Sequence, residues 1–258
     1  MKVITVWNMK GGVGKTTLSF NLATNFAERG QKTLCIDLDP QANLTSYFES
    51  GKRVKGSKPD IAELAMTDFK DLDKGIYRSK YEHLDFVFGC NSEVLIGSME
   101  KLAKALDAMA DKGCEYTYCI IDCHPDFSMT TKNALYAADL VLVPISLDGF
   151  SRDNLNLVKN NLLKVEEERE ILTGQEKELP YWVVSNRVAN RRSQREVYKD
   201  IVTKHDYPFL DLCITESAAV QSANVIHKPV SQHRRFSAPA ADLKELTEKV
   251  VDLLEGVD

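Results

Sequence analysis

Glycine, threonine and lysine residues gather in one short stretch near the N-terminus. Residues 10–17 are Lys-Gly-Gly-Val-Gly-Lys-Thr-Thr. A short apolar run, residues 2–8, precedes the stretch, and a helical pattern over residues 15–29 follows it. Glycines let the backbone approach a phosphate group, and the N–H groups of a helix N-terminus attract its negative charge. Composition and placement together predict a P-loop, a site for the phosphates of a nucleoside triphosphate.

The side chains of this stretch have predicted tasks in phosphate chemistry. Lys15 can reach the β- and γ-phosphates, and the Thr16 hydroxyl can ligate Mg²⁺. We therefore expect ATP and Mg²⁺ to bind here. The alternative is a glycine-rich turn without a ligand, which the length of the motif and its strand-to-helix placement disfavour. The predicted nucleotide-binding residues of the loop are Gly11, Gly12, Val13, Gly14, Lys15, Thr16 and Thr17.

Two acidic positions complete the expected hydrolytic site. Asp122 ends the apolar run at residues 118–121, where a carboxylate can hold Mg²⁺ through water. Asp39 follows the apolar run at residues 33–38 and is a candidate to orient the attacking water and to contact the metal. Each aspartate also has a structural alternative. Asp122 can cap the next turn, and Asp39 can cap a helix that begins near Asn43.

A regular alternation of apolar runs and helical patterns must position these residues. It predicts an α/β fold, a P-loop NTPase with a mostly parallel twisted sheet flanked by helices on both faces. One domain over residues 1–258 is expected, because the Gly-, Ser- and Lys-rich residues 50–59 suit an exposed loop better than a linker. The expected strands are 2–8, 33–38, 83–88, 116–122, 140–145 and 182–186, and the clearest helices are 15–29, 92–111 and 240–254.

The bulk composition is that of a globular protein. The chain has 258 residues, 43% of them hydrophobic, and a net charge of −5. An acidic total argues mildly against a dedicated nucleic-acid binder, although a local basic patch is compatible with it. The six cysteines form no Cys-x-x-Cys pair and no zinc-spaced cluster with histidine, so reduced thiols in the cytoplasm are expected. No signal peptide and no run of about 20 apolar residues is visible.

Residues 10–17 are similar to the deviant Walker A box of the ParA/MinD superfamily, in which an extra lysine precedes the glycines. Residues 37–43 resemble that family's switch I, and residues 121–125 resemble its switch II. Residues 133–144 resemble the family stretch that follows. Within the superfamily, the ParA branch of partition ATPases, also called Soj, is the most similar.

The resemblance implies a nucleotide-driven cycle with Lys10, Lys15 and Asp39 as catalytic residues. ATP binding drives a face-to-face homodimer, in which Lys10 reaches across to the partner's phosphates much as an arginine finger does. The family has a base-recognising residue where Asn186 stands. The dimer binds double-stranded DNA without sequence preference, and a ParB-type partner stimulates slow hydrolysis. Without the resemblance, Lys10 would be interpreted as a solvated lysine at a strand end.

Three features set this chain apart from relatives in the superfamily. His124 stands before Pro125 where the family has a second proline, and we expect it to change loop contacts without removing Mg²⁺ binding. Residues 212–214, Leu-Cys-Ile, replace a Pro-Arg stretch that helps wall the adenine, so the adenine contacts there stay open. The acidic residues 242–258 disfavour the MinD-type attachment to an anionic membrane, and no membrane partner is expected.

A basic cluster in this acidic chain is the candidate DNA-binding surface. Residues 187–199 hold five basic residues and one acidic residue. Ser193 and Glu196 have capping-box spacing, so a helix is expected to begin at Ser193. Phosphate contacts by such a cluster would make binding salt-dependent; the alternative is a solvated helix end. The candidates are Arg187, Arg191, Arg192, Arg195 and Lys199, with a second patch at Arg234 and Arg235.

Two classes of function fit these features. The first is a nucleoid-associated partition ATPase that segregates plasmid or chromosomal DNA, or a ParA-like ATPase that positions a protein cargo. The second is a metabolic P-loop enzyme, such as an ATP-dependent ligase or kinase. Lys10 and the basic cluster favour the first class, because a ligase or kinase acting on a small substrate needs neither.

Overall fold

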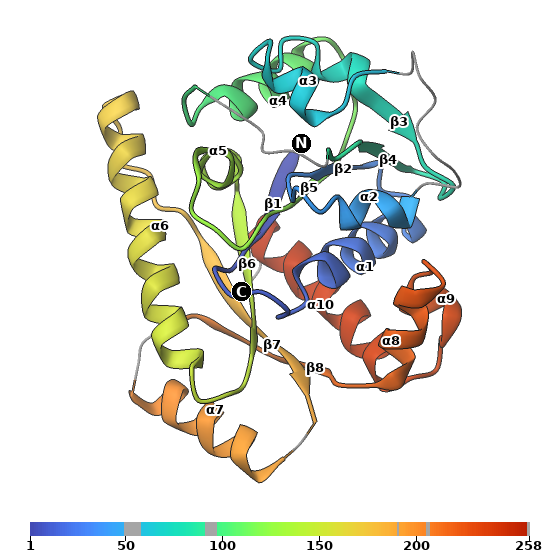
Figure 1. Ribbon diagram of the computed structural model, residues 1–258, viewed down its shortest axis with the longest axis vertical. Helices are drawn as coiled ribbons and strands as arrows, with labels where there is room; N and C mark the ends of the chain where they lie inside the picture. The colour runs from blue at the N-terminus through green and yellow to red at the C-terminus, as the bar shows by residue number, and fades with distance from the viewer. Residues whose placement is uncertain (49–57, 91–96, 190, 205–206, 257–258) are drawn as a thin grey trace.

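The computed structural model describes residues 1–48, 58–90, 97–189, 191–204 and 207–256, and in these residues eight strands form one sheet (Figure 1). The strand order is β3-β4-β2-β5-β1-β6-β7-β8, and only β3 with β4 is antiparallel. All six predicted strands are present, whereas β3 and β8 are not foreseen by the sequence patterns. The bounds are β1 Lys2–Val6, β2 Thr33–Asp37, β3 Ile76–Arg78, β4 Leu84–Val87, β5 Tyr118–Asp122, β6 Leu140–Ser146, β7 Tyr181–Val188 and β8 Phe209–Thr215.

Helices cover both faces of the sheet, as predicted. α1, α2, α8, α9 and α10 pack on one face, and α3 to α7 pack on the other. The predicted loop 50–59 lies almost wholly outside the described residues, as do residues 92–96 of the helix predicted over 92–111. Residues 97–100 are bends and turns, so this helix begins later than predicted, at Lys101. The helices are α1 Lys15–Glu28, α2 Asn43–Phe48, α3 Ile61–Ala65, α4 Lys101–Asp111, α5 Met129–Ala137, α6 Ser151–Thr173, α7 Arg192–Lys204, α8 Ala218–Val225, α9 Val230–His233 and α10 Ala238–Glu255, with a 3₁₀ turn at Leu72–Gly75.

The central strands are buried on both sides, which explains their continuous apolar runs. In β5, Tyr118 and Ile120 face the core beneath α1, while Cys119 and Ile121 face the core beneath α4 and α5. The ring of Phe26 on α1 stacks on Tyr118 with 3.9 Å between ring centroids. This packing fixes α1, and with it the start of α1 at Lys15, against the sheet.

Parallel register brings the polar strand ends together. Val6 of β1 and Asp37 of β2 both lie opposite Asp122 of β5. The segment that follows β1 is the glycine-rich stretch 10–17. Because the carboxyl ends of parallel strands meet at one edge of a sheet, this stretch and both aspartates share that edge.

The contacts at the start of two helices differ from the predictions. The backbone N–H and hydroxyl of Thr45 in α2 donate to Asp37 Oδ2 at 2.8 and 3.0 Å, so Asp37 rather than Asp39 satisfies the first turn of this helix. The capping-box prediction at Ser193 is wrong, because α7 already begins at Arg192. Glu196 pairs with Arg192 instead of reaching back to the backbone.

No helix in the described part of the chain combines the length and the apolar character needed to cross a membrane.

We predict that Phe26→Ala destabilises the protein by about 3–5 kcal/mol, because it empties a buried ring site between α1 and the sheet. Phe26 is fully buried, whereas Phe236 is 98% exposed. Phe236→Ala removes the same ring from solvent and should change the free energy of unfolding by less than about 0.5 kcal/mol. Urea unfolding of both variants measures the difference. Equal effects would contradict the packing described for α1.

Candidate functional site

A cavity of about 420 Å³ opens at the carboxyl edge of the sheet, beside the glycine-rich stretch. Its wall combines this stretch and the start of α1 with the end of β7, the end of β8 and α8. Val13 and Asp122 are buried and are not among the lining residues. The sequence-predicted residues that line the cavity are Gly11, Gly12, Gly14, Lys15, Thr16, Thr17, Asp39 and Asn186.

Gly14 is the N-cap residue of α1 and has a conformation that suits only glycine. Its φ is +94°, in the left-handed region. A Cβ at this position would lie 2.3 Å from Nδ2 of Asn186. That nitrogen is held in place, because it donates to the Val13 carbonyl at 2.7 Å. The end of β7 and the glycine-rich loop therefore fit together only with glycine at position 14.

Lys15 is a buried cation in this wall, with 6% of its surface exposed. Its Nζ donates to the Lys10 carbonyl at 3.2 Å. Burial lowers the pKa of Lys15, and the nearby Asp122 carboxylate opposes that change. A cation with few protein partners at a cavity wall is suited to bind an anionic group.

The Thr16 hydroxyl and the Asp122 carboxylate form a pair of oxygen donors at the wall of the cavity. Thr16 Oγ1 donates to Asp122 Oδ2 at 2.7 Å, and Ser19 Oγ donates to Asp122 Oδ1 at 2.9 Å. Burial raises the pKa of Asp122 to about 7, and the neighbouring Asp37 carboxylate adds to the rise. A cation beside this pair would relieve both effects.

These donors fit Mg²⁺. The ion prefers oxygen ligands, and it commonly takes one or two carboxylates together with water and substrate phosphates. Among the described residues no group of three His, Cys, Asp or Glu side chains could hold a metal alone. A site built from one hydroxyl and one carboxylate therefore suits Mg²⁺ delivered with a nucleotide better than a metal cage.

Asp39 lies at the cavity with 8% of its surface exposed. Its Oδ1 accepts a hydrogen bond from the Gln41 N–H at 2.9 Å. The carboxylate is thus held by the turn that precedes α2 and still lines the cavity. Burial raises the pKa of the adjacent Asp37 to about 6, since Asp37 lies deeper in the protein.

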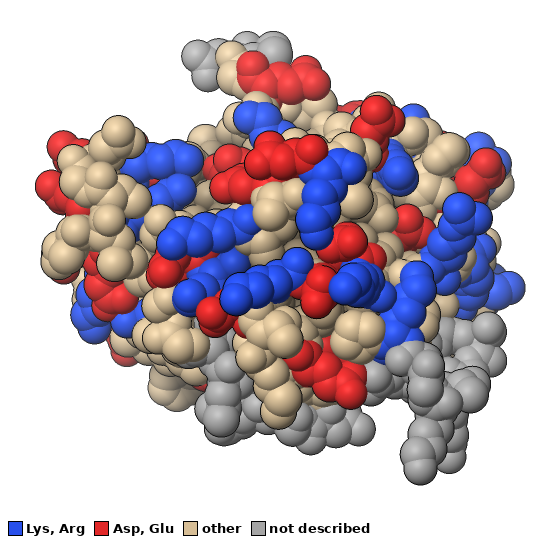
Figure 2. Space-filling model, turned by 90° about the horizontal axis from the view of Figure 1, so that it is seen from above, with Lys and Arg blue, Asp and Glu red and all other residues tan. Residues whose placement is uncertain are grey.

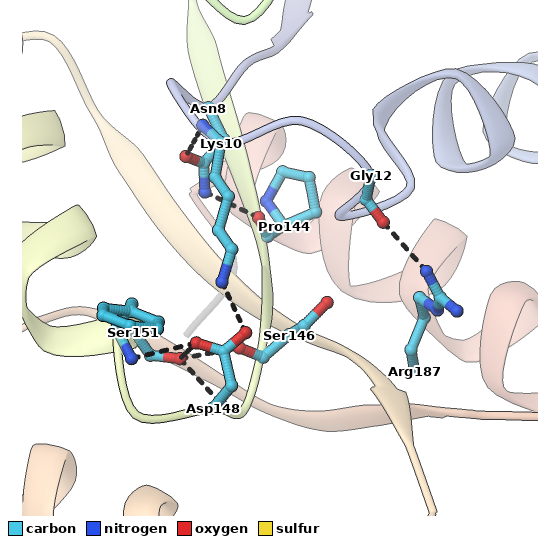
Figure 3. A network of polar contacts seen from close by, with 9 residues as sticks. Asn8, Lys10, Gly12, Pro144, Ser146, Asp148, Ser151 and Arg187 are labelled. Atoms are coloured by element: carbon cyan, nitrogen blue, oxygen red, sulfur yellow. Dashed lines mark hydrogen bonds and ion pairs between the residues drawn. The ribbon is translucent and has the colours of Figure 1, made fainter.

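Lys10 is not among the residues that line the cavity. Its ammonium group forms an ion pair with Asp148, at the end of β6 (Figure 3). The Lys10 N–H donates to Asn8 Oδ1 at 2.9 Å, and Asn8 Nδ2 donates to the Pro144 carbonyl at 2.8 Å. The sequence analysis missed Asp148, although its place just after a parallel strand put it at the same edge of the sheet.

The predicted DNA-binding residues do not form one cluster. Arg187 lines the cavity, and Arg191 lies outside it. Both pair with Glu216, with N–O distances of 3.7 and 3.3 Å. The remaining candidates are exposed: Arg192, Arg195 and Lys199 on α7, and Arg234 and Arg235 at the end of α9. Figure 1 separates α7 from α9, so these are two different surfaces.

The face around α3 and α4 has mixed charge. Figure 2 shows Lys and Arg side chains interspersed with Asp and Glu over the described part of this face. Lys101 pairs with Asp68, and Lys112 pairs with Asp73. Such a surface has no single-sign field to attract a polyanion.

The sequence analysis also missed the wall formed by β8 and α8. Thr215, Glu216 and Gln221 line the cavity there. Asn224 on α8 donates to Thr17 Oγ1 at 3.1 Å, and its own Oδ1 is buried without a protein partner. The available signal in the sequence was the recurrence of Leu210, Leu212 and Ile214 at every second position, which is typical of a strand with one buried face.

Residues 1–174 match the model of a known family, described as AAA domain. The chain belongs to this family. Within this family, the chain is similar to curated proteins of the ParA/Soj type. The sporulation initiation inhibitor protein Soj of Bacillus subtilis is 34% identical over 174 residues, which are 64% of this chain and 66% of Soj.

Two solved structures are similar to this chain over nearly its whole length. A plasmid partition protein of Borrelia burgdorferi bound to AMPPNP has a TM-score of 0.77 and 25% identity, covering 99% of this chain and 98% of that one. Cobyrinic acid a,c-diamide synthase of Mycobacterium smegmatis, with ADP and magnesium, has a TM-score of 0.78 at 20% identity, covering 100% of this chain and 96% of the synthase. The second likeness shows a shared fold only.

We predict that Gly14→Ala destabilises the ligand-free protein by about 1–3 kcal/mol, because the new Cβ strains the backbone and displaces Asn186 from the Val13 carbonyl. Gly11→Ala is the matched control, since a Cβ there meets no atom within 4 Å. Urea unfolding without nucleotide measures both. Comparable destabilisation in the two variants would contradict the fit between β7 and the loop.

Proposed function

We propose that this protein is a partition or positioning ATPase. It binds ATP with Mg²⁺ in the cavity, hydrolyses ATP to ADP and phosphate, dimerises with ATP, and binds double-stranded DNA without sequence preference. Together with a ParB-type partner it segregates plasmid or chromosomal DNA, in association with the nucleoid. The observation that carries the proposal is the meeting of the P-loop, the Thr16–Asp122 pair and Asp39 at one cavity.

The residues at the cavity divide the chemistry among them. The backbone of residues 11–14 and the Lys15 ammonium bind the phosphates, while Asn186, which lines the cavity, is assigned to recognise the base. Thr16 and Asp122 hold Mg²⁺, Asp122 through water, and the ion would neutralise charge that develops on the phosphates. Asp39, held at one oxygen by the Gln41 N–H, orients the attacking water with the other.

Lys10 is assigned to the partner's nucleotide. In a single chain its ammonium group is paired with Asp148, where it stays partly exposed. Exposed ion pairs contribute only about 0–1 kcal/mol, so a phosphate of a second subunit can replace Asp148 as the partner of Lys10 at little cost. The plasmid partition protein of Borrelia burgdorferi, which binds AMPPNP, supports this class of function.

The exposed basic residues of α7 are the proposed DNA contacts, with Arg234 and Arg235 as a second surface. Arg195 and Lys199 are four residues apart on α7, so they project from neighbouring turns of the helix. A metabolic ligase or kinase remains the second candidate, because cobyrinic acid a,c-diamide synthase shares the fold. ATP-dependent positioning of a protein cargo would use the same nucleotide site.

We predict that Lys15→Ala weakens ATP binding at least about tenfold, since it removes a charged hydrogen-bond donor to the phosphates. Asp39→Ala should keep the ATP dissociation constant within about threefold and lower turnover at least about 100-fold, since it removes the group that orients water. Titration with a fluorescent ATP analogue and phosphate release measure the two quantities. Normal hydrolysis by the Asp39 variant would rule out its assigned role.

We also predict binding to arbitrary duplex DNA with ATP and Mg²⁺ but not with ADP. Simultaneous substitution of Arg192, Arg195 and Lys199 by alanine should weaken this binding. It should also reduce the slope of log affinity against log salt concentration by up to about 0.9 for each lost phosphate contact. Mobility-shift assays over a salt series measure both effects, and light scattering reports the dimer. Equal, negligible DNA binding with both nucleotides would refute the partition function and leave the ligase or kinase candidate.

A further inference from the structure

The end of β7 holds the P-loop at two successive peptides. Asn186 Nδ2 donates to the Val13 carbonyl at 2.7 Å. The next residue, Arg187, donates from Nη1 to the Gly12 carbonyl at 3.0 Å (Figure 3). Arg187 does so from a left-handed backbone conformation, with φ +58°, which is uncommon for a residue with a side chain. The backbone therefore turns at the point that aims the guanidinium at the loop.

These two contacts set the direction of two loop N–H groups. In a trans peptide the C=O and the N–H of the following residue point in opposite directions, and the described chain has no cis peptide. Fixing the Gly12 carbonyl toward Arg187 turns the Val13 N–H away from β7, and fixing the Val13 carbonyl does the same for the Gly14 N–H. Within the described residues no protein group accepts a hydrogen bond from either N–H. Two N–H donors are thus oriented and have no protein acceptor among the described residues.

The guanidinium of Arg187 is engaged on its other side as well. Its Nη2 lies 3.7 Å from Glu216 Oε1. Glu216 is itself anchored, because its N–H donates to the Val188 carbonyl at 3.0 Å. Arg187 therefore sits between the P-loop and the β8 wall, and both Glu216 and Arg187 line the cavity. A DNA phosphate at Arg187 would therefore compete with the Gly12 carbonyl and the Glu216 carboxylate for the guanidinium.

We propose that Arg187 is a positioning residue of the nucleotide site, which orients the Val13 N–H toward phosphate through the Gly12 carbonyl, and that it is not a DNA contact. The inference rests on the proposed function in so far as the cavity binds ATP. Because the oriented N–H groups act on bound phosphate before the reaction, losing Arg187 weakens ATP binding more than it slows turnover. The Asp39 carboxylate is untouched by the change.

Arg187→Ala should raise the dissociation constant for Mg-ATP about three- to tenfold, the effect of one partly exposed hydrogen bond to a carbonyl. Turnover at saturating ATP should stay within about twofold of the wild type. Arg187→Lys keeps a donor for Gly12 and should recover part of the affinity. Arg29→Ala is the matched control, because it also removes one cation and one ion pair, with Glu248, remote from the cavity. Titration with a fluorescent ATP analogue and steady-state phosphate release give both quantities.

The outcomes separate the two proposals. A wild-type protein that binds no ATP refutes the proposed function itself. If the wild type binds ATP, unchanged affinity in Arg187→Ala overturns the positioning role. An equal loss of affinity in Arg191→Ala also overturns it, because the effect would then arise from Glu216 and not from Gly12. Thermal unfolding of each variant identifies a folding defect. In that case Arg187→Met, which keeps the aliphatic stem but has no donor for Gly12, decides: reduced affinity at wild-type stability supports the role, and wild-type affinity overturns it.

The DNA assay supplies an independent test. Arg187→Ala should leave the slope of log affinity against log salt unchanged when compared at saturating ATP. A slope reduced by about 0.9, together with unchanged ATP affinity, would make Arg187 a phosphate contact and overturn the proposal.

Discussion

The parallel register of β1, β2 and β5 is the constraint on which the nucleotide site depends. Val6 and Asp37 both lie opposite Asp122, so the loop after β1 and two carboxylates end at the same level. A slip of β5 by one residue would move Asp122 to the opposite face, away from Thr16 and Ser19. The continuous apolar runs of these strands stabilise the sheet but do not distinguish one face from the other. The polar ends, paired by hydrogen bonds, therefore contribute to fixing the register.

Burial makes this edge electrostatically costly. Asp37 and Asp122 are buried near each other, and burial together with their mutual repulsion raises the pKa of Asp122 to about 7. Hydrogen bonds from Thr16, Ser19 and Thr45 offset part of that cost. Lys15, a buried cation nearby, offsets a further part and in turn has its pKa lowered by burial. The packing of α1 and α2 on the sheet stabilises the fold and offsets the free-energy cost of burying these charges.

The fold was predictable where the pattern was strong. Strands buried on both faces have continuous apolar runs, and the six strands of this kind were all expected. β3 has only three residues, and β8 alternates buried and exposed positions at the edge of the sheet. Neither strand therefore has a continuous apolar run in the sequence. The predicted start of α7 was wrong because the capping-box spacing at Ser193 does not reveal which partners the side chains choose. The Gln194 side chain accepts a hydrogen bond from the Ala189 N–H, and Glu196 pairs with Arg192.

The sequence by itself determined the chemistry that lies within one stretch. Glycines, Lys15 and Thr16 are neighbours in the chain, so their spacing was enough to predict a phosphate site. Only the tertiary structure decided which distant residues meet. Asp148 is 138 residues from Lys10, and Arg187 is 175 residues from Gly12. The order β1-β6-β7 places the strand ends that carry them side by side. Arg187 seemed to belong with its basic neighbours in the chain, but a left-handed turn at the end of β7 directs it to the P-loop.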